Sequence, residues 1–145
     1  MTKKLLRMIV GGLAAVLGVL GFACCYGPAV EYGVPYTSFK ATGVVEDASG
    51  DAIQGISVKL IESDNLDNDQ NQGVFTNSDG IYITEPLQGM SNILILRVED
   101  IDGAENGSYE NTDLTADYTS VTATGSSGWY QGLKTKTIDV TLNKK

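Results

Sequence analysis

Histidine is absent from the 145 residues of this chain, and cysteine is nearly so. Histidine is a common zinc ligand and the usual partner of a catalytic nucleophile, so its absence argues against zinc hydrolysis and against serine–histidine chemistry. The only two cysteines, Cys24 and Cys25, are adjacent, and adjacent cysteines form a disulfide only with strain. A disulfide framework is therefore excluded. We predict no catalytic residue and expect that the protein is not an enzyme.

Positive charge is also scarce. The chain has 10 basic and 18 acidic residues, which gives a net charge of −8. Three of the basic residues, Lys3, Lys4 and Arg7, lie in an N-terminal segment that we expect to be removed. The remaining acidic surface would repel phosphate backbones, so nucleic acid is not an expected partner. The acidity instead suits the solubility of an exported domain.

The N-terminus is typical of a secretory signal peptide. Its basic start is followed by an uncharged apolar run from Met8 to Phe22 and then by small residues. This run has 15 residues, fewer than the roughly 20 that a membrane-spanning helix needs. An uncleaved membrane anchor is the alternative. We prefer cleavage and assign residues 1–24 to a lipoprotein signal peptide.

The cysteine pair at the end of the apolar run predicts lipidation, because its setting resembles the cleavage region of bacterial lipoproteins. Cleavage before Cys25 places the bulky Phe22 ahead of two small residues. Cleavage before Cys24 would place Phe22 where a small residue is usual. We therefore predict a lipid on Cys25, with Cys24 as the alternative. The mature protein is then expected in the cell envelope, at the outer membrane, on a face that the sequence leaves open.

The stretch from Lys40 to Leu60 predicts a β-hairpin. Its second arm alternates Ile56, Val58 and Leu60 with polar residues, as a half-buried strand does. Turn-forming residues between Ser49 and Gly55 separate the two arms. We expect the three branched side chains to face a core.

Further short strands follow, and the mature chain has no helical period. Asn92 to Val98 is the most apolar run, which predicts a strand buried on both faces. A second turn is expected where Asn77 to Gly80 separate short strands at Phe75–Thr76 and Ile81–Thr84. Other expected elements are an acidic connection at Glu99–Asp113, a strand at Tyr118–Thr124, a loop at Gly125–Gly132 and a strand at Lys136–Leu142.

About seven short strands separated by turns predict a single all-β domain, a sandwich or a barrel. We assign residues 39–145 to this domain. Residues 25–38 are expected to form an extended tether, because Pro28 and Pro35 lack amide donors and hold their neighbours extended.

Two segments resemble the carboxypeptidase regulatory-like domain, which is a transthyretin-like (prealbumin-like) sandwich. The family usually has proline where Ala52 stands and a small residue where Ile56 stands. The resemblance implies a single seven-stranded Greek-key β-sandwich. A zinc carboxypeptidase domain often accompanies this domain in the family, and we expect none in this sequence. The matching residues are Gly43, Val45, Asp47, Gly50, Ile53, Gly55, Val58 and Leu60, followed by the run from Thr76 to Ile83.

A narrower resemblance covers nearly the whole chain. The order of its segments is similar to that of the Bacteroidetes-type radical SAM-associated putative lipoproteins. Membership would imply a neighbouring gene for a radical SAM enzyme, which thereby becomes an expected partner. The segments are Gly21–Cys25, Tyr32–Pro35, Lys40–Leu60, Asp100–Gly107 and Lys144–Lys145.

Two further sets of residues are candidates for ligand binding. Asp100, Asp102 and Glu105, followed by Asn106, provide the oxygen atoms that calcium prefers. The alternative is a solvated turn in which Asp102 and Asn106 cap backbone amides, with no cofactor at all. Trp129 and Tyr130 are flanked by glycines and could present rings to a sugar or peptide. The alternative for Trp129 is a place in the core or at a sheet edge, and its exposure distinguishes the two.

Together these patterns predict a non-enzymatic, lipid-anchored envelope protein. We expect it to be an interaction partner, or a modification target, in a radical SAM-associated system. A carbohydrate- or peptide-binding accessory module and a structural spacer are the alternatives, and the sequence leaves the oligomeric state open.

Overall fold

The computed structural model describes residues 33–66 and 72–145. The chain divides into two units, residues 1–33 and 34–145, and the second contains all of the described strands. The predicted signal peptide, Cys24, Cys25 and most of the predicted tether lie outside the described residues. Within the described ranges, no helix has the length and hydropathy that crossing a membrane requires.

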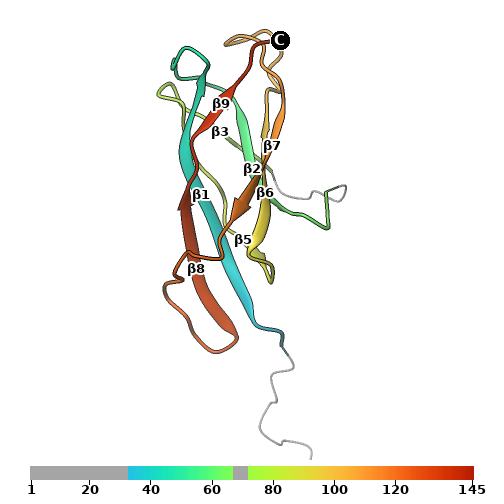
Figure 1. Ribbon diagram of the computed structural model, residues 1–145, viewed down its shortest axis with the longest axis vertical. Helices are drawn as coiled ribbons and strands as arrows, with labels where there is room; N and C mark the ends of the chain where they lie inside the picture. The colour runs from blue at the N-terminus through green and yellow to red at the C-terminus, as the bar shows by residue number, and fades with distance from the viewer. Residues whose placement is uncertain (1–32, 67–71) are drawn as a thin grey trace, which may run out of the picture. The chain divides into compact units, whose positions relative to one another are not determined.

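The described residues contain nine β-strands, and the fold is all-β as predicted (Figure 1). The strands are β1 (Tyr36–Asp47), β2 (Ser57–Glu62), β3 (Val74–Phe75), β4 (Ile81–Ile83), β5 (Leu87–Gly89), β6 (Ile93–Glu99), β7 (Thr112–Asp117), β8 (Tyr130–Thr137) and β9 (Val140–Leu142).

The strands form two sheets that pack as a sandwich. In the first sheet, the long strand β1 pairs with β4 and β5 along one edge, both antiparallel, and with β8 and β9 along the other, both parallel. The second sheet is antiparallel with the order β3-β2-β6-β7. Because β4 and β5 share one edge of β1, and β8 and β9 share the other, the nine strands occupy seven positions.

From Ser38 onward, β8 and β9 keep a single register along β1, since Thr42 lies opposite Thr137 and Val45 opposite Val140. An irregularity between Tyr36 and Ser38 shifts the register of β8 by one residue. Between β8 and β9 the ladder is interrupted where the Val44 amide donates to Asp139 Oδ1 at 3.1 Å. At this point the carbonyl oxygen of Ile138 occupies the space that a Cβ on Gly43 would need. A side chain at this position would therefore force the two strands apart.

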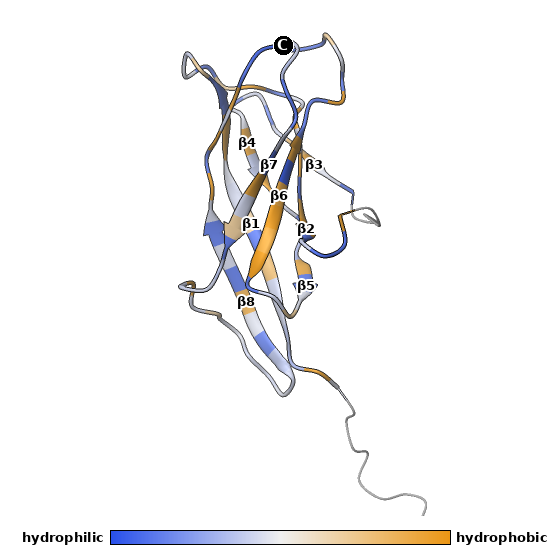
Figure 2. Ribbon diagram, turned by 45° about the vertical axis from the view of Figure 1, so that its right-hand side comes forward, coloured by the Kyte–Doolittle hydropathy of each residue, from blue (hydrophilic) through white to orange (hydrophobic). Residues whose placement is uncertain are grey.

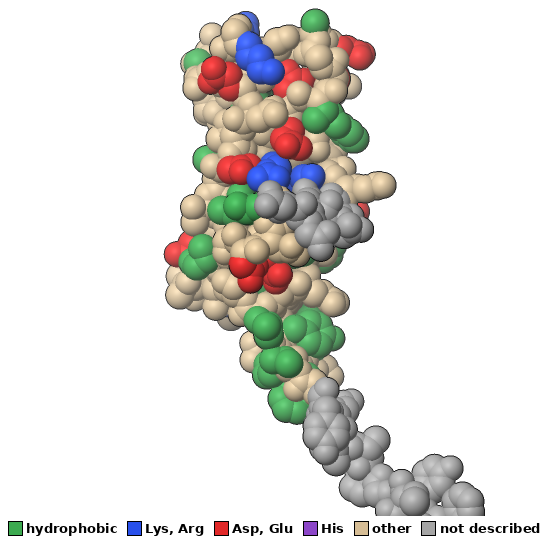
Figure 3. Space-filling model, turned by 90° about the vertical axis from the view of Figure 1, so that its right-hand side faces the viewer, with side chains coloured by type: hydrophobic (Ala, Val, Ile, Leu, Met, Phe, Trp, Pro, Cys, Tyr) green, Lys and Arg blue, Asp and Glu red, His purple; other side chains and the backbone are tan. Residues whose placement is uncertain are grey.

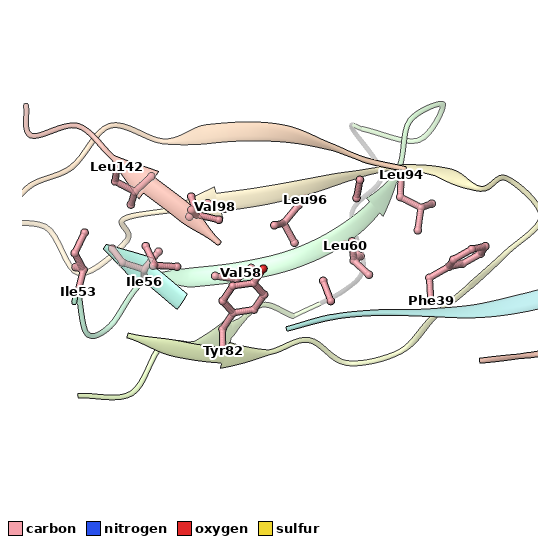
Figure 4. Packing of buried hydrophobic residues seen from close by; sticks show 14 of the residues in the cluster. Phe39, Ile53, Ile56, Val58, Leu60, Tyr82, Leu94, Leu96, Val98 and Leu142 are labelled. Carbon is pink, nitrogen blue, oxygen red and sulfur yellow. The ribbon is translucent and has the colours of Figure 1, made fainter. Parts of the chain in front are cut away.

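The core lies between the sheets and is filled by alternate residues of β1, β2 and β6. Val58 and Leu60 of β2 are buried, as is Ile56 just before it, so the predicted face is confirmed. Figure 4 shows these side chains beside those of β6, with Tyr82 of β4 pointing into the same layer. The fully buried large side chains are Tyr82, Tyr118, Phe39, Ile56, Leu94, Leu96, Leu142, Val45, Val58, Val98 and Val140.

The prediction that β6 is buried on both faces is wrong. Leu94, Leu96 and Val98 are buried, but Ile93 on the other face is 38% exposed and Ile95 is half-buried. Figure 2 shows the strongly hydrophobic colour along β6. The outer isoleucines raise the hydrophobicity of the run without being covered by another layer.

The predicted hairpin between residues 40 and 60 is also wrong. A tight turn does form, because Asp47 Oδ1 accepts hydrogen bonds from the Ser49 and Asp51 amides at 2.9 and 3.0 Å. Its return leg is short and ends where the Ile53 amide donates to the Val45 carbonyl. The chain then crosses to the second sheet, so β1 and β2 face each other across the core and do not pair. Strands β3 and β4 are divided between the sheets in the same way.

The C-terminal half differs from the expected elements in position. Strand β7 lies at Thr112–Asp117, partly within the predicted acidic connection, and the segment predicted as a strand from Tyr118 begins instead with a turn. Asp117 Oδ1 ends the strand by accepting a hydrogen bond from the Thr119 amide at 2.8 Å. The sequence of β7 did not show the alternation of a half-buried strand clearly, because its only inward apolar residues are Leu114 and Ala116. The predicted strand Lys136–Leu142 is divided between β8 and β9.

The predicted tether extends too far into the domain. Strand β1 begins at Tyr36, and Thr37 and Ser38 are buried within the sheet. The sandwich therefore starts before Phe39, the predicted first residue of the domain.

Candidate functional sites

Trp129 lies on the surface, immediately before β8. Its side chain is 42% exposed, so it does not belong to the core. Its backbone carbonyl accepts a 3.1 Å hydrogen bond from the Tyr36 amide, which attaches the loop to the start of β1. The exposure argues against a place in the core, whereas the hydrogen bond to β1 agrees with the other alternative, a place at the sheet edge.

Tyr130 forms an aromatic pair with Tyr36 on the neighbouring strand. The ring centroids are 5.3 Å apart and the planes are tilted by 38°. Because the rings come from strands far apart in the sequence, the parallel pairing of β1 and β8 creates this pair. The predicted Trp129–Tyr130 set thus extends to Tyr36, which sequence reasoning missed. The sequence placed Tyr36 in the expected tether, so its position beside Tyr130 became visible only with the strand pairing.

The acidic loop from Asp100 to Glu105 does not assemble as the predicted metal site. Among the described residues, no three histidine, cysteine or acidic side chains lie together in an arrangement that could hold a metal ion. The carboxylates of the loop bind protein groups instead. Asp100 Oδ2 accepts from the Tyr109 amide at 2.8 Å, and Asp102 Oδ2 accepts from Asn106 Nδ2 at 3.1 Å.

The second carboxylate oxygen of each of these two aspartates is shielded from solvent. Asp100 Oδ1 and Asp102 Oδ1 have no hydrogen-bond partner within the described structure. Asp102 also lies against Gly55, where a Cβ would come within 2.7 Å of Asp102 Oδ2. The loop is therefore packed on the turn that leads into β2. The two carboxylates bind groups within residues 100–109 and so stabilise the loop itself, and Glu105 takes no part in these hydrogen bonds.

The residues that carry the resemblance to the regulatory-like domain have structural roles. Thr76 is buried, and its hydroxyl donates to the Ile53 carbonyl at 2.6 Å while accepting from the Ile56 amide at 3.0 Å. Asn77 Oδ1 accepts from the amides of Asp79 and Ile81, both at 3.0 Å. These bonds stabilise the two crossings between the sheets. The motif therefore specifies the fold and does not by itself indicate a ligand.

An open hollow lies on the outer face of the second sheet, over β6 and β7. It has a volume of about 300 Å³, and Arg97 and Asp113 are in its wall. Arg97 Nε and Nη2 donate to the two Asp113 oxygens at 3.0 and 2.9 Å. These hydrogen bonds lower the pKa of Asp113 below its usual value. The pair joins β6 to β7, and the remaining wall residues are Glu99, Asn111 and Thr112.

Exposed apolar side chains form a further feature that sequence reasoning missed. Ile81 and Ile83 alternate with the buried Tyr82 and are 42% and 54% exposed, and Phe75 of β3 is 58% exposed. A second group lies where β1 begins, and includes Val34 and Met90 at 64% and 70% exposure. Periodicity identifies such residues as strand-forming, but it does not reveal which face remains uncovered.

No protein-family model and no curated protein matches the chain. Chlorocatechol 1,2-dioxygenase from Pseudomonas putida is a structural neighbour with a TM-score of 0.46 and 12% identity, over 81% of this chain and 70% of the enzyme. A Streptococcal ancillary pilin gives a TM-score of 0.45 and 11% identity, over 74% of this chain and 32% of the pilin. Catechol 1,2-dioxygenase from Pseudomonas arvilla C-1 gives a TM-score of 0.45 and 12% identity, over 81% of this chain and 54% of the enzyme. Likenesses this low carry no argument about activity.

Proposed function

We propose that the protein is a lipid-anchored, non-enzymatic protein of the cell envelope, attached through Cys25. The position of the cysteines carries this proposal, because both precede the fold and none occurs from residue 26 onward. The sandwich, which begins at Tyr36, therefore contains no cysteine in its own sequence. Strand β1 begins at Tyr36, so only residues 26–35 separate it from the proposed lipid.

The proposed role is that of an interaction partner or modification target in a system with a radical SAM enzyme. This part rests on the ordered resemblance described above. The loop from Asp100 to Gly107, which belongs to that resemblance, lies on the surface, and its Ile101 side chain is 60% exposed. A partner could therefore reach this loop without opening the sandwich.

The intact mass of the protein purified from the envelope tests the anchor and any further modification together. We expect a mass that exceeds the chain from Cys25 by a lipid, and its loss in Cys25→Ala together with a shift out of the detergent phase. Cys24→Ala is the matched control and should retain the lipid. If only Cys24→Ala removes the lipid, cleavage occurs one residue earlier. If neither substitution removes the mass of a lipid, the protein is not a lipoprotein.

A second candidate function is a carbohydrate- or peptide-binding accessory module. The exposure of Trp129 favours it, because aromatic rings in surface loops provide large apolar contact areas for ligands. A glycan and peptide array with the purified protein tests it. Binding that is lost in Trp129→Ala but retained in Phe75→Ala, which removes a more exposed aromatic ring elsewhere, would support this function.

A further inference from the structure

One end of the sandwich is built from residues that carry no charge, although the chain as a whole has a net charge of −8. We call this end the uncharged pole. Three segments that are far apart in the sequence form it, and none of them contains Asp, Glu, Lys or Arg. They are residues 33–39, 86–96 and 118–133.

Strand pairing brings these segments together. Across the first sheet, Thr37 lies opposite Gly89 and Tyr36 opposite Tyr130, so the starts of β1 and β8 meet the end of β5. The Tyr118 amide donates to the Asn92 carbonyl at 2.8 Å, which joins the third segment to the residues just before β6. The pole therefore spans both sheets.

The pole is also apolar on its surface. Val34 is 64% exposed, Met90 70%, Trp129 42%, Ile93 38% and Tyr36 36%. They are half of the ten large hydrophobic side chains that are exposed among the described residues, and so the apolar surface is concentrated here. In Figure 3 the lower end of the described surface is the pole, and it carries green and tan side chains without red or blue.

We propose that the uncharged pole docks on the headgroup layer of a phospholipid bilayer. The inference rests on the proposed lipid anchor, because the anchor decides which end of the sandwich meets the membrane. Val34 belongs to the pole and follows Cys25 by nine residues, a distance of at most about 30 Å when fully extended. The anchor therefore keeps the pole at a high effective concentration beside the lipid surface.

The charge distribution agrees with this orientation. An anionic membrane surface repels acidic groups, and the acidic residues lie outside the pole. The charged side chains that reach the pole have both signs, since Lys134 Nζ donates to Asn92 Oδ1 and to the Tyr118 carbonyl oxygen, and a Glu62 oxygen lies close to Gly89. Tryptophan and tyrosine suit the boundary between water and lipid, because they combine an apolar ring with a polar tip.

Trp129 makes the proposal testable, since it is the only tryptophan in the chain. The lipidated protein would be reconstituted into phosphatidylethanolamine–phosphatidylglycerol vesicles, with or without lipids brominated near the headgroup. We expect brominated lipid to quench Trp129 fluorescence and the vesicles to protect it from acrylamide in water. Val34→Ser and Met90→Ser should weaken both effects. Ile101→Ser, which removes an equally exposed apolar side chain from the acidic loop, should leave both unchanged.

Three results would overturn the proposal. If the protein floats with the vesicles while acrylamide still reaches Trp129 and brominated lipid does not, the anchor stands and the docking fails. If the protein does not float with the vesicles, the anchor fails and the docking fails with it. If protection from acrylamide rises with protein density and brominated lipid has no effect, a second copy of the chain covers the pole.

Discussion

The hydroxyl of Tyr118 donates a 2.8 Å hydrogen bond to the carbonyl oxygen of Lys40, and thereby joins the end of β7 in one sheet to β1 in the other. The Tyr118 ring also meets Phe39 edge to face, with centroids 5.1 Å apart. Tyr118→Phe keeps the ring and removes only the hydrogen bond. We expect it to lower the free energy of unfolding by about 1–2 kcal/mol, measured by urea denaturation. Tyr130→Phe is the control and should change stability little. Equal losses of stability in both variants would show that the hydrogen bond to Lys40 contributes no more to stability than the Tyr130 hydroxyl does.

Alkaline pH should destabilise the protein through its buried tyrosines. Burial raises the pKa of Tyr82 and of Tyr118 well above the usual value, so both hydroxyls stay protonated in the folded state. Above a pH of about 10 the unfolded chain releases these protons, and stability then falls as the pH rises. Urea titrations across this range should show a steeper decline for the natural protein than for the double variant Tyr82→Phe, Tyr118→Phe. Parallel declines would contradict the prediction.

The core should depend on β2 at Leu60, which is 2% exposed. Leu60→Ala removes contacts between the two sheets and should lower the free energy of unfolding by roughly 2–5 kcal/mol. Leu66→Ala is the same change at a side chain that is 41% exposed, and should stay within about 0.5 kcal/mol. Thermal or urea unfolding measures both. Similar losses at the two positions would mean that the assigned register of β2 is wrong.

Calcium should have no specific effect on the acidic loop. Asp100 and Asp102 already bind protein groups, and no third acidic side chain joins them among the described residues. Millimolar calcium and magnesium should therefore shift the melting temperature equally, by screening the negative surface. A shift that only calcium produces, and that Asp102→Asn abolishes, would instead establish a bound ion that stabilises the folded state.

The sequence by itself determined those features that depend on neighbouring residues. Alternation identified the buried face of Ile56, Val58 and Leu60, because successive side chains of a strand point to opposite sides. The turns at Asp47 and Asn77 were also predictable, since each side chain bonds to amides only two and four residues ahead.

Only the tertiary structure decided which strands pair. Two apolar faces are buried equally well when their strands are neighbours in one sheet and when they face each other across a core. Periodicity therefore could not distinguish a hairpin from the crossing observed between β1 and β2. For the same reason, the sequence predicted one site from Asp100, Asp102 and Glu105, whereas the fold does not bring the three carboxylates together. It also left apart Tyr36, Met90 and Trp129, which long-range strand pairing gathers at one pole.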